Sequence, residues 1–412
     1  MKTFVSVSLA YFLMLFFAAT PPEPTQVKNV DPDGTEAVIH KGIEWLVKAQ
    51  FENGGWGAGT HANQGILDPK AVQVDPATTA FAAMALLRAG NTLHEGEYKT
   101  NLRKALNFLL EEVEKSPAES VNITSLTGTQ PQVKLGQNID VSMTSRFFTR
   151  ILPFATDDPA LTKRINQAQD KCLSKIQRSQ NADGSIQGGT WAGVLQSAVA
   201  NIALEEAAEA GYAVDSVTMI RSKDYQKMNI DATSGAVVTD KSAGVQLYSL
   251  SSTTRATAKS YKKAKEQLET ARDEGVFDDM QMSSPSQAIP MTEENLRKTG
   301  MGESEVKAIM QDVRTNEIAR KQVQTDQVMA GFGNNGGEEF LSHMMTSESM
   351  VLSGGEEWTN WNNRMKTMMT RIQNPDGSWS GHHCITSPVF CTAAALLTIT
   401  VDQDKSFTAE RQ

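Results

Sequence analysis

The sequence predicts an all-α protein built from repeated helical hairpins. A seven-residue turn signature occurs three times, and each copy follows a segment with helical spacing of its apolar residues. Each copy also precedes an apolar stretch rich in small residues. A recurring pattern of this kind is typical of repeat architectures, in which each unit buries its apolar face against its neighbours.

The turn signature is clearest in its first and last copies, which align without gaps at residues 50–56 and 373–379. Both contain a Gln, an Asn or Asp, the Gly that follows it, and a closing Trp. The middle copy, at residues 180–186, ends in Ile instead of Trp. In every copy an apolar residue stands four positions before the Gln: Leu46, Ile176 and Met369.

The residue types of the signature suit a helix end. A glycine just past a helix adopts positive φ at no steric cost, so we expect that conformation at Gly54, Gly184 and Gly377. The preceding Asn or Asp can accept hydrogen bonds from backbone amides of the turn. The closing Trp can stack on the preceding turn, and we expect its indole N–H to find an acceptor such as a Gln side chain.

The apolar spacing predicts the helices that flank these turns. Inner helices with small residues are expected after the three signatures, at residues 77–89, 191–207 and 389–399. Degenerate units are expected as an outer helix at 101–113, an inner helix at 141–152 and a weaker inner candidate at 242–251. Small side chains let helices approach closely, which suits the crowded inner ring of a barrel.

These residues resemble the repeat of squalene–hopene cyclases, protein prenyltransferase β-subunits and the wider α/α-toroid superfamily. The likeness extends to exported bacterial proteins that carry prenyltransferase/squalene-oxidase repeats. It covers roughly residues 37–90, 160–210 and 337–400. The resemblance implies an α/α toroid in which each Gln-to-Trp turn joins an outer helix to an inner one. It implies no particular activity, because a fold does not determine a function.

The middle of the chain, residues 252–329, departs from this pattern because it is polar and charged. A narrow apolar seam from Tyr261 to Ala271 predicts one helix, and a second is expected at 303–327, with a break around Pro285 and Pro290. We interpret the segment as an inserted helical hairpin that is accessory to the ring. A partly disordered, solvated insert is the alternative.

The N-terminus predicts export. Lys2 precedes an apolar run at residues 4–19, which is the pattern of a secretory signal. We expect a periplasmic or extracellular protein. Phe17 would occupy the small-residue position before a cut after Ala19, so retention of the segment as an N-terminal membrane anchor stays open.

The expected organisation follows from these observations. It comprises a signal peptide or anchor at 1–20, a linker at 21–35, the first part of the toroid at 36–251, the inserted hairpin at 252–329, the last part of the toroid at 330–402 and a tail at 403–412.

Composition excludes one class of partner. The 39 basic and 48 acidic residues give a net charge of −9. Duplex binding needs clustered Lys and Arg to neutralise phosphates, so we expect no nucleic-acid partner. In an oxidising compartment, the three cysteines predict one disulfide, for which Cys384 and Cys391 are the candidate pair, and one buried thiol at Cys172.

The catalytic motifs of the resembling families are missing. The cyclases use an acid within an Asp-x-Asp-Asp motif, and only shorter matches occur, at residues 31–33 and 402–404. Prenyltransferases hold zinc with an Asp-x-Cys pair, and neither Cys384 nor Cys391 follows an Asp at that spacing. The thioester run Gly-Cys-Gly-Glu-Gln of other toroids is absent. The sequence leaves open whether the protein is an enzyme.

Two stretches carry candidate site residues. In the first, at residues 381–384, His382 and His383 precede Cys384. Imidazole and thiolate can bind zinc, but adjacent histidines rarely face one ion, so we expect no metal and no cofactor. The candidate ligand-binding residues are His382, His383, Trp379 and Phe340.

The second stretch begins at Gly336. Glu339 and His343 are four positions apart and share a helix face, so they form the candidate catalytic acid–base pair. The alternative is that Glu338 and Glu339 complement a helix N-terminus. A second Gly-Gly-Glu-Glu run at residues 354–357 favours this capping role.

The leading functional interpretation is an exported toroid that binds a hydrophobic small molecule or a polymer in a central cavity. One alternative is a terpenoid cyclase-like or prenyltransferase-like enzyme with a non-standard acid. Another is an envelope scaffold whose protein partner binds residues 252–329. An apolar aromatic cavity would favour an isoprenoid, a polar cavity a peptide or glycan, and a filled cavity the scaffold.

Overall fold

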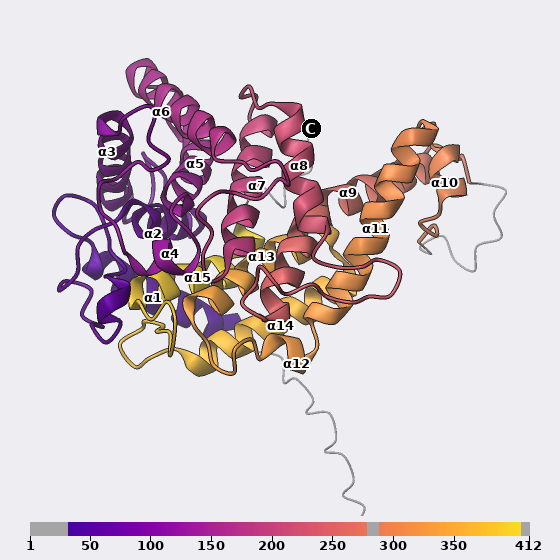
Figure 1. Cartoon of the computed structure of the whole chain (residues 1–412). Helices are drawn as coiled ribbons and strands as arrows, with labels where there is room; N and C mark the ends of the chain where they lie inside the picture. Colours follow the sequence, from indigo (N-terminus) through magenta and orange to yellow (C-terminus); the bar gives the residue numbers. More distant parts are fainter. Residues whose placement is uncertain (1–31, 278–287, 405–412) are drawn as a thin grey trace, which may run out of the picture.

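The computed structural model describes residues 32–277 and 288–404. These residues form α-helices and short 3-10 helices joined by loops, with isolated β-bridges and no strand among them (Figure 1). The all-α class is confirmed. The signal-like segment 1–20, residues 21–31 of the linker, the break at Pro285 and residues 405–412 lie outside the described residues.

Six helices form an inner ring. They are α2 (Pro76–Arg88), α5 (Ile139–Ile151), α7 (Gly193–Glu209), α9 (Gln246–Asp273), α13 (Gly337–Ser353) and α15 (Pro388–Ile399). Each packs against the next in this order, and α15 packs back against α2. The contacts therefore close on themselves.

A second set of helices packs outside this ring: α1 (Pro32–Ala49), α3 (Lys99–Lys115), α6 (Pro159–Arg178), α8 (Ser216–Lys227), α11 (Glu303–Val323) and α14 (Gly355–Ile372). Outer helices α3, α6, α8, α11 and α14 each pack on the inner helix that neighbours them in the chain, whereas α1 packs on α15. The shorter elements are α4 (Gln130–Lys134), α10 (Glu293–Lys298), α12 (Asp326–Met329), η1 (His61–Asn63), η2 (Leu152–Phe154) and η3 (Val401–Gln403).

The turn signatures have one geometry. Gly54, Gly184 and Gly377 all adopt positive φ, as predicted. The indole N–H of Trp56 donates to the carbonyl of Leu46 at 2.7 Å, and that of Trp379 to the carbonyl of Met369 at 2.9 Å. The expectation of a Gln acceptor is wrong, because the fully buried indole reaches the last turn of the preceding helix, whose carbonyls lack partners within the helix.

The Gln of each signature instead links neighbouring outer helices. Gln50 donates to the Asn101 carbonyl near the start of α3, and Gln180 donates to the Thr218 carbonyl in α8. Gln373 donates to the Val38 carbonyl of α1 at 2.9 Å, so the last hairpin is joined to the first. The same side-chain contact therefore also closes the outer layer.

Sequence analysis missed a fourth turn of this kind, between α8 and α9. Ile230 and Val237 form a β-bridge, as Gln180 and Ile186 do in the middle signature. Gly235 adopts positive φ, and its carbonyl accepts a hydrogen bond from Gln322 of the outer helix α11. This turn contains neither the Gln nor the Trp of the signature, and its Gly alone is too common to identify it in the sequence.

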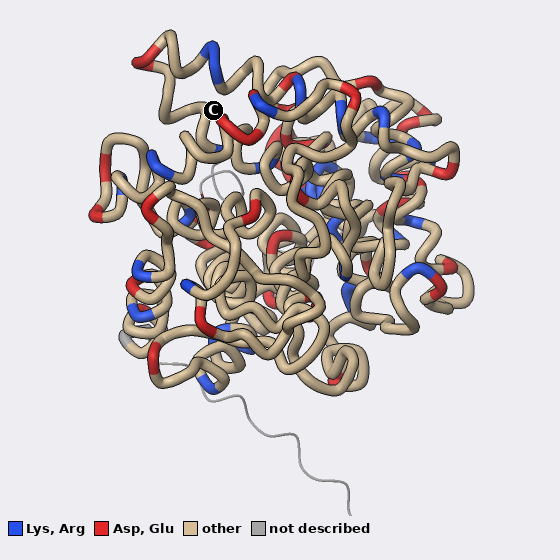
Figure 2. Tube along the Cα trace, turned by 60° about the vertical axis from the view of Figure 1, so that its left-hand side comes forward, with Lys and Arg blue, Asp and Glu red and all other residues tan. Residues whose placement is uncertain are grey.

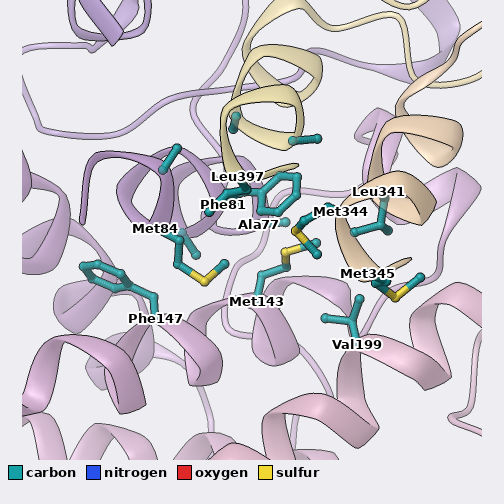
Figure 3. Close-up of a cluster of buried hydrophobic side chains, with 14 of the residues drawn as sticks. Ala77, Phe81, Met84, Met143, Phe147, Val199, Leu341, Met344, Met345 and Leu397 are labelled. Atoms are coloured by element: carbon teal, nitrogen blue, oxygen red, sulfur yellow. The ribbon is translucent and has the colours of Figure 1, made fainter. Parts of the chain in front are cut away.

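Apolar side chains fill the interior of the inner ring (Figure 3). Phe81 and Met84 of α2 meet Met143 and Phe147 of α5, together with residues of α7, α13 and α15. All four of these side chains are buried. Surface hollows of about 490 Å³ and about 330 Å³ lie outside the ring, between α6 and α8 and beside α3.

The boundary expected at residues 251/252 falls inside a helix. Ser252 lies inside α9, which runs without interruption from Gln246 to Asp273. The first half of α9 is buried against α13 and α7, and only its second half projects with α10 and the start of α11 (Figure 1). The projecting part, which we call the arm, has a small core of its own around Leu268 and Val306. Sequence analysis assigned the first half of α9 to a polar insert because it is rich in Ser and Thr. In the structure these side chains are buried.

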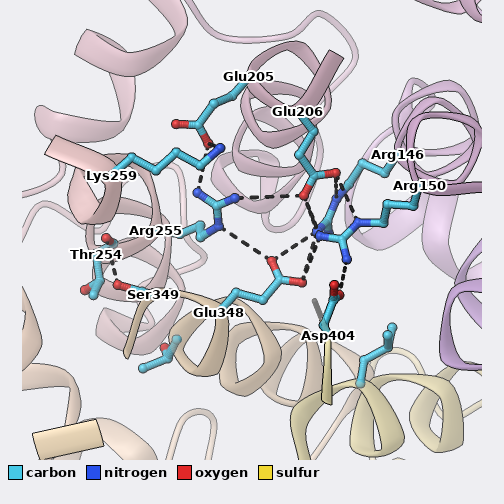
Figure 4. A network of polar contacts seen from close by, with 12 residues as sticks. Arg146, Arg150, Glu205, Glu206, Thr254, Arg255, Lys259, Glu348, Ser349 and Asp404 are labelled. Atoms are coloured by element: carbon cyan, nitrogen blue, oxygen red, sulfur yellow. Dashed lines mark hydrogen bonds and ion pairs between the residues drawn. The ribbon is translucent and has the colours of Figure 1, made fainter. Parts of the chain in front are cut away.

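All six inner helices point in the same direction. At one end, which we call the mouth, residues before or within their first turns contact one another: Ala77 N donates to Asp140, and Asn138 N donates to Gln196. At the other end, charged residues from the C-terminal parts of the inner helices, from the middle of α9 and from the segment after α15 meet in a largely buried network (Figure 4). The network joins Arg88, Arg146, Arg150, Arg255, Glu205, Glu206, Glu348 and Asp404.

Helix dipoles favour the positions of two charged residues of α2. Acidic groups are stabilised near helix N-termini and cations near C-termini. Accordingly, Asp75 caps α2 at the mouth, whereas Arg88 ends the same helix in the network. Elsewhere, Lys and Arg are interspersed with Asp and Glu along the helices (Figure 2).

Candidate ligand-binding site at the mouth of the ring

The two stretches that carry candidate site residues lie side by side at the mouth. Gly337 N donates to the Ile385 carbonyl at 2.8 Å, and His382 N donates to the Asn335 carbonyl at 2.8 Å. A Cβ atom on Gly336 would lie 2.7 Å from the His383 carbonyl oxygen, so this approach requires glycine. Residues 47 or 48 positions apart in the chain are thereby held together.

Glu339 stabilises the start of α13. Its carboxylate accepts hydrogen bonds from Gly336 N at 2.9 Å and Phe332 N at 3.1 Å. It also accepts one from the Tyr248 hydroxyl at 2.6 Å. The predicted capping role is therefore confirmed, and the hydroxyl ties α9 to α13. His383 Nε2 lies 3.8 Å from the same carboxylate.

His343 points elsewhere. It is fully buried, its ring centroid lies 6.4 Å from that of Trp361 on the outer helix α14, and neither ring nitrogen has a hydrogen-bond partner. Burial, with the charge of Arg364, lowers the pKa of His343 to about 4. Glu339 and His343 share a helix, but the structure does not join them into an acid–base pair.

Glu338 is the unusual carboxylate of the mouth. One oxygen accepts a hydrogen bond from Ile385 N at 3.2 Å, while the other, Oε1, is buried without a partner. Burial, and then the neighbouring charge of Glu339, raise the pKa of Glu338 to about 8. Two adjacent carboxyl groups thus have different surroundings, and Glu338 is largely protonated at neutral pH.

The cysteines are free thiols in the structure. The disulfide expected between Cys384 and Cys391 is not formed. The thiol of Cys391 points to the Ile385 carbonyl at 3.7 Å, whereas Cys384 hydrogen-bonds with Lys134. Burial raises the pKa of Cys384 to about 11, so this thiol is not an activated nucleophile.

Two exposed aromatic residues meet near Glu339, which accepts a hydrogen bond from the backbone of one of them, Phe332. Trp191 is 39% exposed and Phe332 is 54% exposed, and their rings meet edge to face with centroids 6.0 Å apart. The His383 ring lies 5.4 Å from Phe332, and Lys134 Nζ lies 4.7 Å from the centre of the Trp191 ring. We call these four residues the aromatic platform.

The platform comes from separate loops that precede inner helices. Lys134 belongs to α4, Trp191 lies just before α7, Phe332 before α13 and His383 before α15. A fifth loop joins them, since Gln64 donates to the Cys384 carbonyl. Binding residues are often placed on loops of a rigid scaffold in this way.

The other predicted ligand-binding residues have different positions. Trp379 is buried in its turn and Phe340 in the core, so neither faces a ligand at the surface. His382 is exposed beside the platform. Sequence analysis missed Lys134, Trp191 and Phe332. Exposure of large aromatic residues was the missing signal, and the sequence pattern had placed Trp191 within a helix.

Comparison with known proteins supports part of this picture. Residues 24–130 match the family model of the squalene-hopene cyclase C-terminal domain. The match covers about a quarter of the chain and includes the first turn signature, α2 and α3. No curated protein shows significant similarity to the chain. This region is therefore similar to a squalene-hopene cyclase domain, whereas most of the mouth lies beyond the match.

The described residues also bear on metals and membranes. Within 32–277 and 288–404, no three His, Cys, Asp or Glu side chains gather as a metal site. In the same ranges, no helix has the length and apolarity needed to cross a bilayer.

Proposed function

We propose that the chain, apart from its signal-like segment and the arm, is an α/α toroid related to the squalene-hopene cyclases, and that it binds a ligand on the aromatic platform. The closed cycle of inner-helix contacts and the three matching turns support the toroid. The apolar run at residues 4–19 supports a location outside the cytoplasm, as a periplasmic or extracellular protein.

One observation carries the binding proposal. Trp191 and Phe332 are large aromatic side chains that pack against each other and stay exposed at the point where loops from several repeats meet. Exposed aromatic clusters beside polar groups mark binding surfaces. We place the ligand here instead of in a central cavity, because Phe81, Met143 and their neighbours occupy the ring interior.

Thermal melting in the presence of ligand tests this function. Farnesol, a proline-rich peptide and cellotetraose represent the three ligand classes. A ligand that binds the folded protein raises its Tm by mass action. We expect at least one probe to raise the Tm of the wild-type protein and to lose this effect in Trp191→Ala.

The matched control is Phe154→Ala, which removes an exposed aromatic ring in η2, away from the mouth. This variant should respond to the probe like the wild type. An equal Tm increase in Trp191→Ala would place the ligand away from the platform.

A second function rests on Glu338. A buried carboxyl group with a raised pKa and an unpartnered oxygen has the properties of a general acid. This observation favours the enzyme alternative, with Glu338 as the non-standard acid. Incubation with squalene, followed by mass spectrometry of the products, tests it. Product formation by the wild type that is lost in Glu338→Gln would support catalysis. If the wild type forms no product, the enzyme function fails and ligand binding remains as the proposed function.

A further inference from the structure

We infer that the ligand of the aromatic platform is a glycan. This inference rests on the proposed binding function and names the chemistry of its ligand. The platform combines exposed aromatic rings with a cluster of hydrogen-bonding side chains and backbone groups. Sugars present the same two features, because apolar C–H faces stack on aromatic rings while hydroxyl groups donate and accept hydrogen bonds.

The polar partners of the platform lie around its edge. Lys134 provides an ammonium group beside Trp191, and His383 provides a partly exposed imidazole beside Phe332. Burial, and then the charge of Lys134, lower the pKa of His61. Nδ1 of His61 lies 2.7 Å from Gln64 Nε2. Several donors and acceptors thus surround two rings, as recognition of a hydroxyl-rich molecule requires.

An apolar small molecule fits this site less well. Pockets for such ligands enclose most of the ligand surface. Trp191 and Phe332 instead stand open to solvent, and the ring interior beneath them is filled. A sugar tolerates an open site, because the hydroxyl groups that do not contact the protein remain hydrated.

Peptides that bind as a strand or as a helix also fit less well. Extended peptides add to the edge of a sheet, and helical peptides lie in an apolar groove. The described residues contain no strand, and the two surface hollows given above lie on the outer helices, away from the platform. Stacking on aromatic rings requires neither feature.

Affinity electrophoresis of the full-length protein tests the inference. The protein migrates through native gels that contain hydroxyethyl cellulose, arabinoxylan, galactomannan or polygalacturonate, with a polymer-free gel as reference. We expect at least one of these polysaccharides to retard the wild type. Trp191→Ala and Phe332→Ala should each weaken the interaction at least about tenfold, as expected for a central aromatic contact.

Two variants sharpen the result. Trp191→Phe keeps an aromatic face and should retain part of the retardation. Phe154→Ala should migrate like the wild type. Retardation that stays equal in Trp191→Ala, Phe332→Ala and the wild type would overturn the inference, since the polysaccharide would then bind elsewhere.

Ligand binding at the platform and the glycan nature of the ligand can be tested separately. If no polysaccharide retards the protein, but farnesol or the proline-rich peptide stabilises it in a Trp191-dependent way, the platform binds a ligand that is not a glycan. If no probe of any class depends on Trp191, the proposed binding function fails together with the glycan inference.

Discussion

Arg146 and Glu348 meet across the inner ring. Nη2 of Arg146 lies 3.0 Å from both carboxylate oxygens of Glu348, although α7 and α9 separate their helices on one side and α2 and α15 on the other (Figure 4). Glu348 is fully buried and also bonds Arg88 at 2.8 Å. Burial disfavours its charge, but Arg146, Arg88 and further arginines hold its pKa at about 2.

This geometry predicts that Glu348→Ala strongly destabilises the protein. The substitution leaves Arg88 and Arg146 buried without their shared partner, and breaking a buried pair costs about 3–5 kcal/mol. Urea denaturation measures the change in unfolding free energy. Glu266→Ala is the control, because Glu266 forms an exposed pair with Lys262 and should change stability by less than about 1 kcal/mol. Equal effects of the two substitutions would contradict a structural role for the network.

The turn geometry predicts that Trp379→Ala destabilises the protein by about 3–5 kcal/mol, because the side chain is fully buried and its indole bonds the Met369 carbonyl. Trp191→Ala is the matched control, since that ring is exposed and its loss should cost no more than about 0.5 kcal/mol. Thermal and urea unfolding of both variants measure the difference. Unchanged melting of Trp379→Ala would refute the role assigned to the turn.

A buried acid pair at the mouth predicts that stability falls as pH rises. Burial raises the pKa of Asp75 to about 6, and burial with the charge of Asp75 raises that of Asp140 to about 7. The ordinary value of 3.8 is lower, so the contribution of these groups to stability is complete below about pH 4 and is lost progressively as pH rises from there to 6 for Asp75 and 7 for Asp140. The loss linked to Asp140 is at most about 4 kcal/mol.

Urea midpoints between pH 5 and pH 8 measure this dependence. Asp140→Asn should make the fall in stability between pH 5 and pH 7 smaller, while Glu338, whose pKa is raised to about 8, still contributes to it. Asp183→Asn is the control, because hydrogen bonds with Ser185 lower the Asp183 pKa and that group does not titrate in this range. A wild-type profile that rises towards pH 8 would show that the pair does not titrate as described.

His343 predicts the opposite effect at lower pH. Its folded pKa of about 4 lies below the ordinary value of 6.5, so its stabilising contribution is complete above pH 6.5 and is lost as pH falls towards 4. The total loss is about 3 kcal/mol. His343→Leu should remove this loss and stabilise the protein at pH 7 by about 1–3 kcal/mol, because no unpaired polar group remains buried. Destabilisation at pH 7 would indicate that the imidazole has a partner.

The arm predicts a sharp difference between two deletions. Asn316 Nδ2 donates to Thr257 Oγ1 at 2.9 Å, so the chain can be joined near these residues. Replacing residues 261–312 by a short Gly/Ser linker removes the arm and keeps the ring half of α9, so the protein should fold and melt cooperatively. Replacing residues 252–329 removes ring contacts and should prevent folding. If the protein that lacks residues 252–329 folds, the accessory segment begins at residue 252, as the sequence analysis expected.

Local patterns in the sequence determined the helical class, the three signature turns and most inner helices. The positive φ of Gly184 and the capping by Glu339 depend on neighbouring residues alone, and both were predictable. The burial of Trp379 followed from the same turn chemistry. Its acceptor did not, because the choice between a Gln side chain and a backbone carbonyl depends on where the preceding helix ends.

Only the tertiary structure decided what the mouth contains and where the ring stops. Trp191, Phe332 and Lys134 come from loops far apart in the sequence, and no local pattern specifies their meeting. The polar face of α9 resembled a solvated insert, yet its Ser and Thr side chains hydrogen-bond within the packed ring. The pairing of Arg146 with Glu348 likewise required a closed ring, because only closure brings opposite helices face to face.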